Sequence, residues 1–236
     1  MLEEELRRIN QDFYSRRIDR TEQTIDLEES LSKEVGWGCY ENQYQGFQLA
    51  TNLVNIDWDS TNISILDIGC GYGALARYLR EKKGFQGKYT GIDILATFSE
   101  KASELQGNDN RNNFISGDAL SYNWKNSKYD FVVSLGTLSV NYDYPEPYGK
   151  ESLEFAFKLV NLICQLSCRY ACLYYPNEKN SPLIQRMTST DMAFYDPGDI
   201  EKMFKEVTSG NYKKLITKSY PTADNVKTIT SICFEK

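Results

Sequence analysis

The stretch ILDIGCGYGALARYL, residues 65–79, decides how the rest of the chain is interpreted. It begins as an apolar strand with one acid, passes through Gly69, Gly71 and Gly73, and ends as the start of an amphipathic helix. Glycines leave room for a ligand to approach the backbone, and the free N–H groups of a helix start can bind that ligand. The stretch therefore predicts a ligand site on a strand–turn–helix unit.

Strand-like and helix-like patterns alternate after this stretch. Apolar runs predict strands over 63–69, 88–95, 112–120, 128–138, 169–176, 212–220 and 227–236, and amphipathic runs predict helices over 74–83, 96–106, 151–168 and 196–207. Helices between strands imply parallel pairing, whereas the last two strands have only a short loop between them and must pair antiparallel. We expect an α/β fold: a Rossmann-like, seven-stranded, mostly parallel sheet with an antiparallel final strand pair and helices on both faces.

The N-terminal part reads differently from the rest. Residues 1–34 are polar and helical, with a thin apolar stripe of Leu6, Ile9, Phe13 and Ile18. A glycine-containing turn at 35–43 and a helix over 43–54 follow. Without a linker or repeat, one domain over 1–236 is the simplest interpretation, with 1–58 as a helical extension or lid and 59–236 as a cofactor-binding core.

Composition excludes several function classes. The 236 residues carry a net charge of −6, which argues against a nucleic-acid groove. The chain contains no histidine, so no Ser-His-Asp or Cys-His triad and no His-ligated metal centre is possible. A general base would have to be Asp, Glu, Tyr, Lys, Cys or a water molecule.

The N-terminus lacks the apolar segment of a secretion signal, and no run is long enough to span a membrane. We therefore expect a cytoplasmic protein, either a monomer or a homodimer, without membrane partners. The six cysteines are expected to be free thiols. Cys164, Cys168 and Cys172 have the spacing of a helix stripe, which we interpret as core packing rather than metal binding.

Two nucleotide cofactors fit the glycine turn. The order Gly-x-Gly-x-x-Gly/Ala of dinucleotide-binding turns is satisfied from Gly69 to Ala74. Three acids help to decide which nucleotide cofactor fits this turn. Asp67 lies inside the apolar strand, where a buried acid needs a partner such as a cationic ligand. Asp93 ends the second strand, where it can accept from ribose hydroxyls, and Asp118 ends the third.

At this point the sequence resembles the class I S-adenosylmethionine-dependent methyltransferases. The resemblance rests on ILDIGCGYG, the acid in TGIDI, the SGDAL turn and YDFVVSLGTL, and covers about residues 60–236. The stretch VGWGCYENQ and the helix after it are similar to the N-terminal part of small bacterial methyltransferases. The family implies S-adenosyl-L-methionine as cofactor and S-adenosyl-L-homocysteine as product.

The resemblance also implies roles for individual residues. The backbone of Gly69, Cys70, Gly71 and Gly73 would hold the methionine and ribose parts of the cofactor, and Asp67 would orient the amino group. Asp93, with Ile94, would bind the ribose hydroxyls. The adenine would be bound by Asp118, Ala119 and Leu120, and the methionine part or the acceptor by Ser134 and Leu135.

The acceptor site is expected between the first 45 residues, the segment 139–151 and a rim loop at 176–187. Candidate acceptor residues are Trp37, Tyr40, Gln43, Asn141 and Tyr142, each of which could equally be a packing residue. Aromatic side chains beside carboxylates, as in 142–148, suit an amine, but an ordinary surface loop fits the same pattern.

The sequence favours methyl transfer to nitrogen or oxygen of a small molecule by in-line displacement, for which orientation suffices and a base is optional. No metal is expected, because Asp130 lies at the start of the fourth strand, the wrong end for a metal-dependent site. The alternatives are a non-catalytic S-adenosylmethionine-binding partner, a protein-directed methyltransferase, transfer of an aminopropyl or carboxyl group, and a nicotinamide dehydrogenase.

Overall fold

The computed structural model describes residues 3–18, 26–106, 108–143, 149–177, 191–222 and 228–236. Seven strands form one sheet in the order β3-β2-β1-β4-β5-β7-β6. They are β1 (Ser64–Ile68), β2 (Lys88–Asp93), β3 (Asn112–Ser116), β4 (Tyr129–Leu135), β5 (Ser167–Pro176), β6 (Lys214–Pro221) and β7 (Thr228–Glu235).

The pairing of the strands confirms the predicted fold. β1 to β5 pair in parallel, and β7 runs antiparallel to both β5 and β6. From β1 the sheet extends to β2 and β3 on one side and to β4 and β5 on the other, so strand order reverses between β1 and β4. In open α/β sheets the ligand site lies at the carboxyl ends of the strands at such a reversal.

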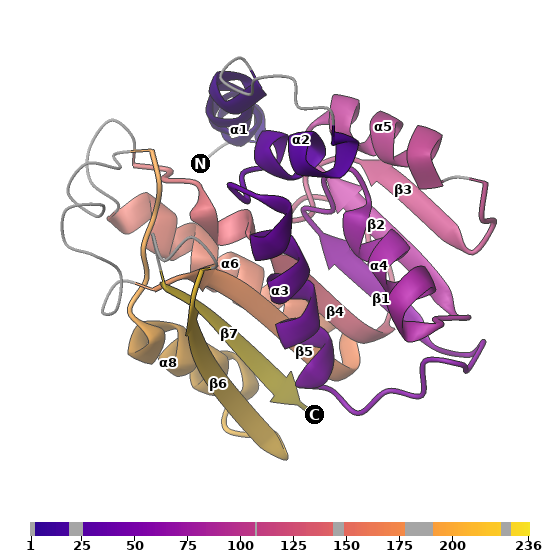
Figure 1. Ribbon diagram of the computed structural model, residues 1–236. Helices are drawn as coiled ribbons and strands as arrows, with labels where there is room; N and C mark the ends of the chain where they lie inside the picture. Colours follow the sequence, from indigo (N-terminus) through magenta and orange to yellow (C-terminus); the bar gives the residue numbers. More distant parts are fainter. Residues whose placement is uncertain (1–2, 19–25, 107, 144–148, 178–190, 223–227) are drawn as a thin grey trace.

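Helices cover both faces of this sheet (Figure 1). They are α1 (Glu3–Ile18), α2 (Leu27–Glu34), α3 (Tyr40–Asn52), α4 (Ala74–Lys83), α5 (Ala96–Gln106), α6 (Lys150–Leu166) and α8 (Pro197–Thr208), and a short 3-10 helix, η1 (Thr137–Ser139), follows β4. α3 and α4 pack on one face, and α6 and α8 pack on the other. α1 and α2 lie across the carboxyl ends of the central strands (Figure 1).

The sheet has an apolar core on each face, and successive side chains of β1 point alternately into one and the other. Ile65 belongs to the cluster under α3 and α4, whereas Leu66 belongs to the cluster under α6 and α8. Both are fully buried, as expected for a strand covered on both faces. Asp67 lies on the same face of β1 as Ile65, because side chains two residues apart point the same way. The acid is thereby directed toward the α4 side of the sheet.

Helix ends follow their sequence signals. α4 ends at Gly84, whose φ of +68° is in the left-handed region, and its N–H donates to the carbonyl of Leu79. α8 begins after Asp196, which accepts a hydrogen bond from the N–H of Gly198, with Pro197 in the first turn. Both ends lie where the sequence predicts them.

Three local predictions need correction. β3 ends at Ser116 instead of 120, because the carbonyl of Asp118 accepts from the N–H groups of residues 121 and 122 in a turn. β4 ends at Leu135 instead of 138, because η1 follows. α3 begins at Tyr40 instead of 43, because its N–H is bound by the carboxylate of Glu29 at 2.7 Å.

The cysteine spacing also has a different origin from the one expected. Cys164 is on α6, whereas Cys168 and Cys172 are on β5, so the three do not share one helix face. Cys164 and Cys172 are buried and Cys168 is exposed. The two buried thiols lie in the apolar clusters, as core packing requires.

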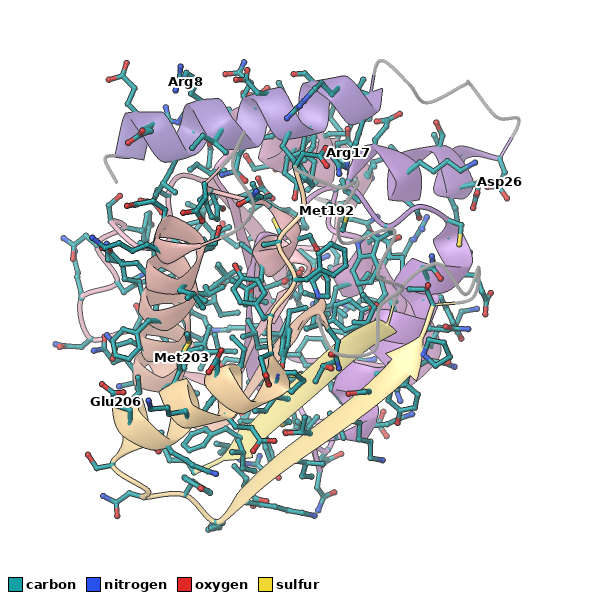
Figure 2. All side chains as sticks on the ribbon, turned by 90° about the vertical axis from the view of Figure 1, so that its left-hand side faces the viewer. Arg8, Arg17, Asp26, Met192, Met203 and Glu206 are labelled. Atoms are coloured by element: carbon teal, nitrogen blue, oxygen red, sulfur yellow. The ribbon has the colours of Figure 1, made fainter. Side chains whose placement is uncertain are left out.

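Figure 2 shows the side chains, with α1 across one end of the molecule, where Arg8 and Arg17 are labelled. Met203 and Glu206 on α8 lie toward the opposite end. None of the helices in the described ranges combines the length and apolar character that crossing a membrane requires.

Candidate functional site

The glycine turn between β1 and α4 is held in a left-handed conformation. Gly69, Gly71 and Gly73 have φ of +77°, +52° and +72°, which favours glycine. A Cβ on Gly69 would lie 2.5 Å from Oγ1 of Thr137, and one on Gly73 would lie 2.8 Å from the ring of Phe114. Protein packing and backbone conformation therefore require these glycines, in addition to any ligand.

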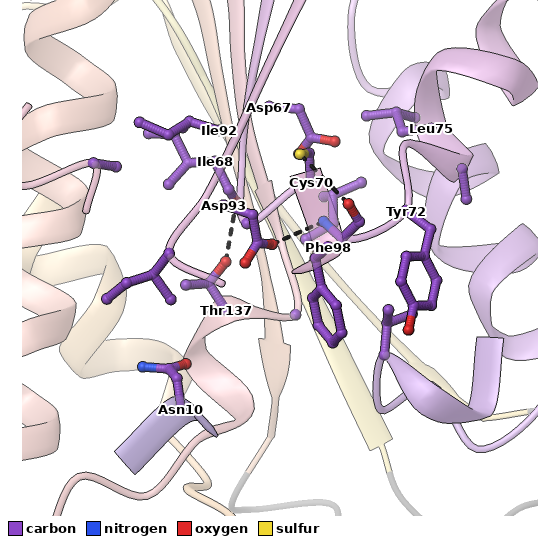
Figure 3. Close-up of a pocket in the computed structure, with 18 of the residues that line it drawn as sticks. Asn10, Asp67, Ile68, Cys70, Tyr72, Leu75, Ile92, Asp93, Phe98 and Thr137 are labelled. Atoms are coloured by element: carbon purple, nitrogen blue, oxygen red, sulfur yellow. Dashed lines mark hydrogen bonds between the residues drawn. The ribbon is translucent and has the colours of Figure 1, made fainter. Parts of the chain in front are cut away.

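Asp93, the last residue of β2, closes this turn. Its Oδ2 accepts from the N–H of Gly71 at 2.9 Å (Figure 3). Its Oδ1 accepts from the N–H of Leu95 at 3.0 Å. Burial raises the pKa of Asp93 to about 6, although these backbone donors lower it. The carboxylate is thus fixed in position at the end of the strand.

Asp67 has a protein partner that the sequence does not reveal. The hydroxyl of Tyr89, on the neighbouring strand β2, donates to Oδ2 of Asp67 at 2.5 Å. Burial raises the pKa of Asp67 to about 7, and the Tyr89 hydrogen bond partly opposes this. The sequence interpretation, in which a cationic ligand is the partner of this acid, is therefore incomplete.

A cavity opens beside these groups, at the carboxyl ends of β1, β2 and β4. It encloses about 1220 Å³ of space not filled by atoms, its solvent mouth included. Of the residues singled out from the sequence, the following line it: Asp67, Gly69, Cys70, Gly71, Asp93, Ile94, Asp118, Ala119, Leu120, Leu135, Trp37, Gln43 and Tyr142. Residues from five segments, far apart in the chain, thus meet at one edge of the sheet.

Four of the residues singled out from the sequence do not line the cavity: Gly73, Ser134, Asn141 and Tyr40. Gly73 faces Phe114. Ser134 is fully buried, and its hydroxyl donates to the carbonyl of Ile68 at 3.0 Å. Asn141 is buried, where its Oδ1 accepts from the Ser152 hydroxyl at 3.2 Å.

Tyr40 lies at the start of α3, where its ring packs near that of Tyr44, outside the cavity. The predicted rim loop at 176–187 lies outside the described residues except for 176 and 177, and 144–148 of the predicted lid segment lie outside them as well.

The roof of the cavity contains residues that sequence reasoning missed. Leu6, Asn10 and Tyr14 of α1 line it, as do Leu31 of α2 and Phe98 of α5. Asn10 lies opposite the glycine turn in Figure 3. The apolar stripe of α1 was the one available signal, but a stripe does not tell what a helix packs against.

α2 is attached to the body by polar contacts. The Tyr72 hydroxyl donates to Glu34 at 2.8 Å, and Arg77 forms an ion pair with Glu28 at 3.0 Å. Behind them, the hydroxyl of buried Ser32 donates to the side-chain carbonyl of Gln43 at 2.7 Å. Tyr72, Arg77 and Gln43 all line the cavity, so α2 and the site form one structure.

Two buried phenols beside the cavity, Tyr14 and Tyr142, are too weakly acidic to serve as bases. Burial raises the pKa of both Tyr14 and Tyr142 above the usual range, and the nearby charge of Asp93 contributes to this increase. The Tyr142 hydroxyl accepts from Nδ2 of Asn10 at 3.3 Å. Both phenols are therefore protonated at neutral pH.

Within the described part of the chain, no three Cys, Asp or Glu side chains gather as a metal site would require. Asp130, at the start of β4, accepts from the N–H and the hydroxyl of Ser64, both at 2.9 Å. That pair belongs to the amino end of the sheet, opposite the cavity.

Residues 65–151 match the family model described as a methyltransferase domain. A protein-lysine N-methyltransferase of Saccharomyces cerevisiae is 40% identical over 82 residues, which are 34% of this chain and 35% of that protein. The chain therefore spans about a third of the length of this curated relative.

Two solved structures show the same fold over nearly the whole chain. Magnesium protoporphyrin IX methyltransferase from Synechocystis PCC 6803, solved with bound S-adenosylhomocysteine, is 17% identical with a TM-score of 0.64, over 98% of this chain and 99% of that one. N-methyltransferase NodS from Bradyrhizobium japonicum WM9, also in complex with S-adenosylhomocysteine, is 10% identical with a TM-score of 0.63, over 95% and 97%.

Proposed function

We propose that this chain is a class I S-adenosylmethionine-dependent methyltransferase, a proposal supported by its residues 65–151 and its fold. It transfers a methyl group from S-adenosylmethionine to an acceptor, which enters beside the carboxyl ends of β4 and β5. The observation that carries the proposal is the cavity that joins the glycine turn to Asp93 and Asp118. The glycine turn follows β1, Asp93 is the last residue of β2, and Asp118 lies just after β3. All three line one continuous space.

The cavity wall fits the proposed cofactor. S-adenosylmethionine presents an ammonium, a sulfonium, two ribose hydroxyls and an adenine, so it needs acceptors and apolar surface. Asp67, Asp93 and Asp118 supply carboxylates. Ala119 and Leu120 supply apolar surface beside Asp118.

Each residue then has a role. Asp93 accepts hydrogen bonds from the ribose hydroxyls while it holds Gly71 in place. Asp118 accepts from the adenine amino group, and its own position is fixed by the N–H of Leu120 at 2.9 Å. Asp67 contributes negative charge on the side of the cofactor's amino group.

The chemistry needs little more than orientation. When bound, the cofactor supplies a methyl group on positively charged sulfur, which is already a good electrophile. The chain's task is to align an acceptor with that group and exclude water, an effect that can be worth about 7–11 kcal/mol. α1 and α2, which roof the cavity, provide the exclusion.

We propose a small molecule as acceptor, with nitrogen or oxygen as the methylated atom. A protein acceptor is the second candidate, favoured by the 40% identity to a protein-lysine N-methyltransferase over 82 residues. A third candidate is a non-catalytic role, in which the chain binds the cofactor in the same cavity but transfers no methyl group. Only a measurement of turnover separates it from the first two candidates. The monomer or homodimer and the cytoplasmic site expected from the sequence remain predictions.

Isothermal titration calorimetry tests the proposal. We expect S-adenosylmethionine and S-adenosylhomocysteine to bind and NAD not to bind. The Asp93→Ala variant should lose about 1–3 kcal/mol of binding free energy, because charged hydrogen bonds to the ribose are lost. Asp57→Ala is the matched control, since Asp57 is exposed and precedes β1 at the far end of the sheet. Absence of S-adenosylhomocysteine binding at millimolar concentration would refute the proposal.

A further inference from the structure

A second, smaller pocket adjoins the cofactor cavity and is built from different chemistry. It shares Tyr14, Val35, Trp37 and Gly136 with the cavity and extends from there toward β5 and β7. Its remaining lining includes Phe13, Asn42, Ser139, Tyr174, Thr222 and Ile229. Because Gly136 directly follows β4, the pocket lies beside the part of the cavity where we propose that the acceptor enters.

Four of the described residues that line this pocket are aromatic: Phe13, Tyr14, Trp37 and Tyr174. Trp37 and Tyr174 pack with ring centroids 5.0 Å apart, and Phe13 and Tyr14 meet edge to face at 4.9 Å. These four rings come from α1, the turn before α3, and β5. Aromatic rings gathered around a small space can bind an ammonium group by cation–π attraction.

Charged side chains are kept out of this pocket. Among the described residues that line it, none is Asp, Glu, Lys or Arg. A neighbouring cation, Arg17, lies with its guanidinium 3.3 Å from the centroid of the Phe13 ring and pairs with Asp191 at 3.4 Å. Figure 2 labels Arg17 on α1 and, below it, Met192, which follows Asp191 in the chain. Its charge is therefore balanced locally.

This lining discriminates between acceptor atoms. An alcohol or phenol must lose its proton to attack, and the pocket offers no carboxylate for this. The chain has no histidine, and Tyr14, the phenol shared with the cavity, is itself protonated because burial raises its pKa. An alkylamine needs no base held in the pocket, because its ammonium form can lose a proton to solvent before the nitrogen attacks.

We propose that this aromatic pocket binds the acceptor, and that the acceptor is an alkylamine. The inference rests on the proposed methyltransferase function and extends it to a substrate class. The amine enters the pocket and gives its proton to solvent. Its lone pair then forms the N–C bond to the methyl carbon while the C–S bond breaks and its electron pair stays on sulfur. The product ammonium loses a second proton to solvent.

Binding measured without turnover is the first test. Calorimetry in the presence of saturating S-adenosylhomocysteine compares choline with 3,3-dimethylbutan-1-ol, a neutral molecule of the same shape. We expect choline to bind about tenfold more tightly, because cation–π attraction acts on the charged molecule alone. Equal affinities, or no choline binding while S-adenosylhomocysteine binds, would overturn the inference and leave the proposed function standing. No binding of S-adenosylhomocysteine itself would refute the proposed function first.

Variants place the cation in this pocket. Tyr174→Leu removes an aromatic face but keeps apolar volume, and Tyr174 does not line the cofactor cavity. We expect choline affinity to fall about threefold to tenfold and S-adenosylhomocysteine affinity to stay within twofold. Tyr129→Leu is the matched control, since Tyr129 begins β4 at the opposite end of the sheet. Equal choline affinity of Tyr174→Leu and wild type would contradict the assignment, and should Tyr174→Leu fail to fold, the choline comparison decides alone.

Turnover then separates the two sources of an alkylamine. S-adenosylhomocysteine formation is measured with hexylamine, with a peptide containing one lysine, and with hexan-1-ol and phenol. We expect the amines to be methylated and the hydroxyl compounds to react at least a hundredfold more slowly. Preference for hexylamine indicates a free amine, and preference for the peptide indicates a protein lysine. Faster reaction of either hydroxyl compound would overturn the inference.

Discussion

Lowering the pH from 7 to 5 should weaken S-adenosylhomocysteine binding about tenfold, through protonation of Asp93. Burial raises the pKa of this carboxyl to about 6. A carboxyl with that pKa is roughly nine-tenths ionised at pH 7 and one-tenth ionised at pH 5. Ribose hydroxyls donate to the ionised form, so binding is strongest above the pKa and is lost as the pH falls below it.

The Asp93→Asn variant identifies the group responsible. It cannot ionise and so represents the protonated form: its affinity at pH 7 should be at least tenfold below that of wild type, and the difference should be much smaller at pH 5. Asp67 has a pKa of about 7 and lines the same cavity, so a smaller dependence with a higher midpoint should remain. The ligand's own amine and carboxyl titrate outside this range.

Calorimetry at pH 5, 6, 7 and 8 measures these affinities for wild type, Asp93→Asn and the exposed control Asp57→Asn. The control should follow wild type at every pH. A wild-type affinity that does not change between pH 5 and 7, or a variant with the full wild-type dependence, would refute the role given to Asp93.

Three further predictions concern stability. Tyr89→Phe should cost about 1–3 kcal/mol at pH 8, because it removes the hydroxyl bound to Asp67. The stability of wild type relative to Asp67→Asn should fall by roughly 3 kcal/mol as the pH rises from 4 to 7. The folded pKa of Asp67, about 7, exceeds the usual 3.8, so the folded state resists ionisation. Gly69→Ala should cost about 2–4 kcal/mol, from a left-handed backbone and a Cβ only 2.5 Å from Thr137.

Urea unfolding measures all three, with a control variant for the tyrosine and the glycine substitutions. Tyr122→Phe alters an exposed tyrosine and should stay within about 0.5 kcal/mol of wild type. Gly210→Ala separates the backbone cost from the contact, because Gly210 has φ of +74° and nothing within 4 Å of its Cβ position. Equal losses for the two glycine variants would disprove the clash, and a Tyr89→Phe protein as stable as wild type would disprove the role of that hydrogen bond. An Asp67→Asn protein whose stability changes with pH as much as that of wild type would disprove the role given to Asp67 in that pH dependence.

The fold could be predicted because its signals are local. Apolar runs, the left-handed stop at Gly84 and the capping residue Asp196 each act within a few residues. The loop between the last two strands is too short for a parallel crossover. The glycine turn and the acids at the strand ends predicted the cavity's location for the same reason.

Other parts of the site depend on contacts between distant segments. Tyr89, the partner of Asp67, is 22 positions away and meets it only when β1 and β2 pair. Tyr14 enters the site because α1 lies across the strand ends. Ser134, at the end of β4, was expected to face the cofactor or the acceptor, but it faces the Ile68 carbonyl instead. No local pattern encodes these arrangements.

The central claim is that S-adenosylmethionine binds in the cavity at the glycine turn. A crystal structure with S-adenosylhomocysteine tests it most directly. The account predicts both ribose hydroxyls within hydrogen-bond distance of the Asp93 carboxylate, the adenine beside Asp118, and the sulfur facing Gly136 and the aromatic pocket. Binding of the ligand elsewhere, or in this cavity with the ribose away from Asp93, would contradict it.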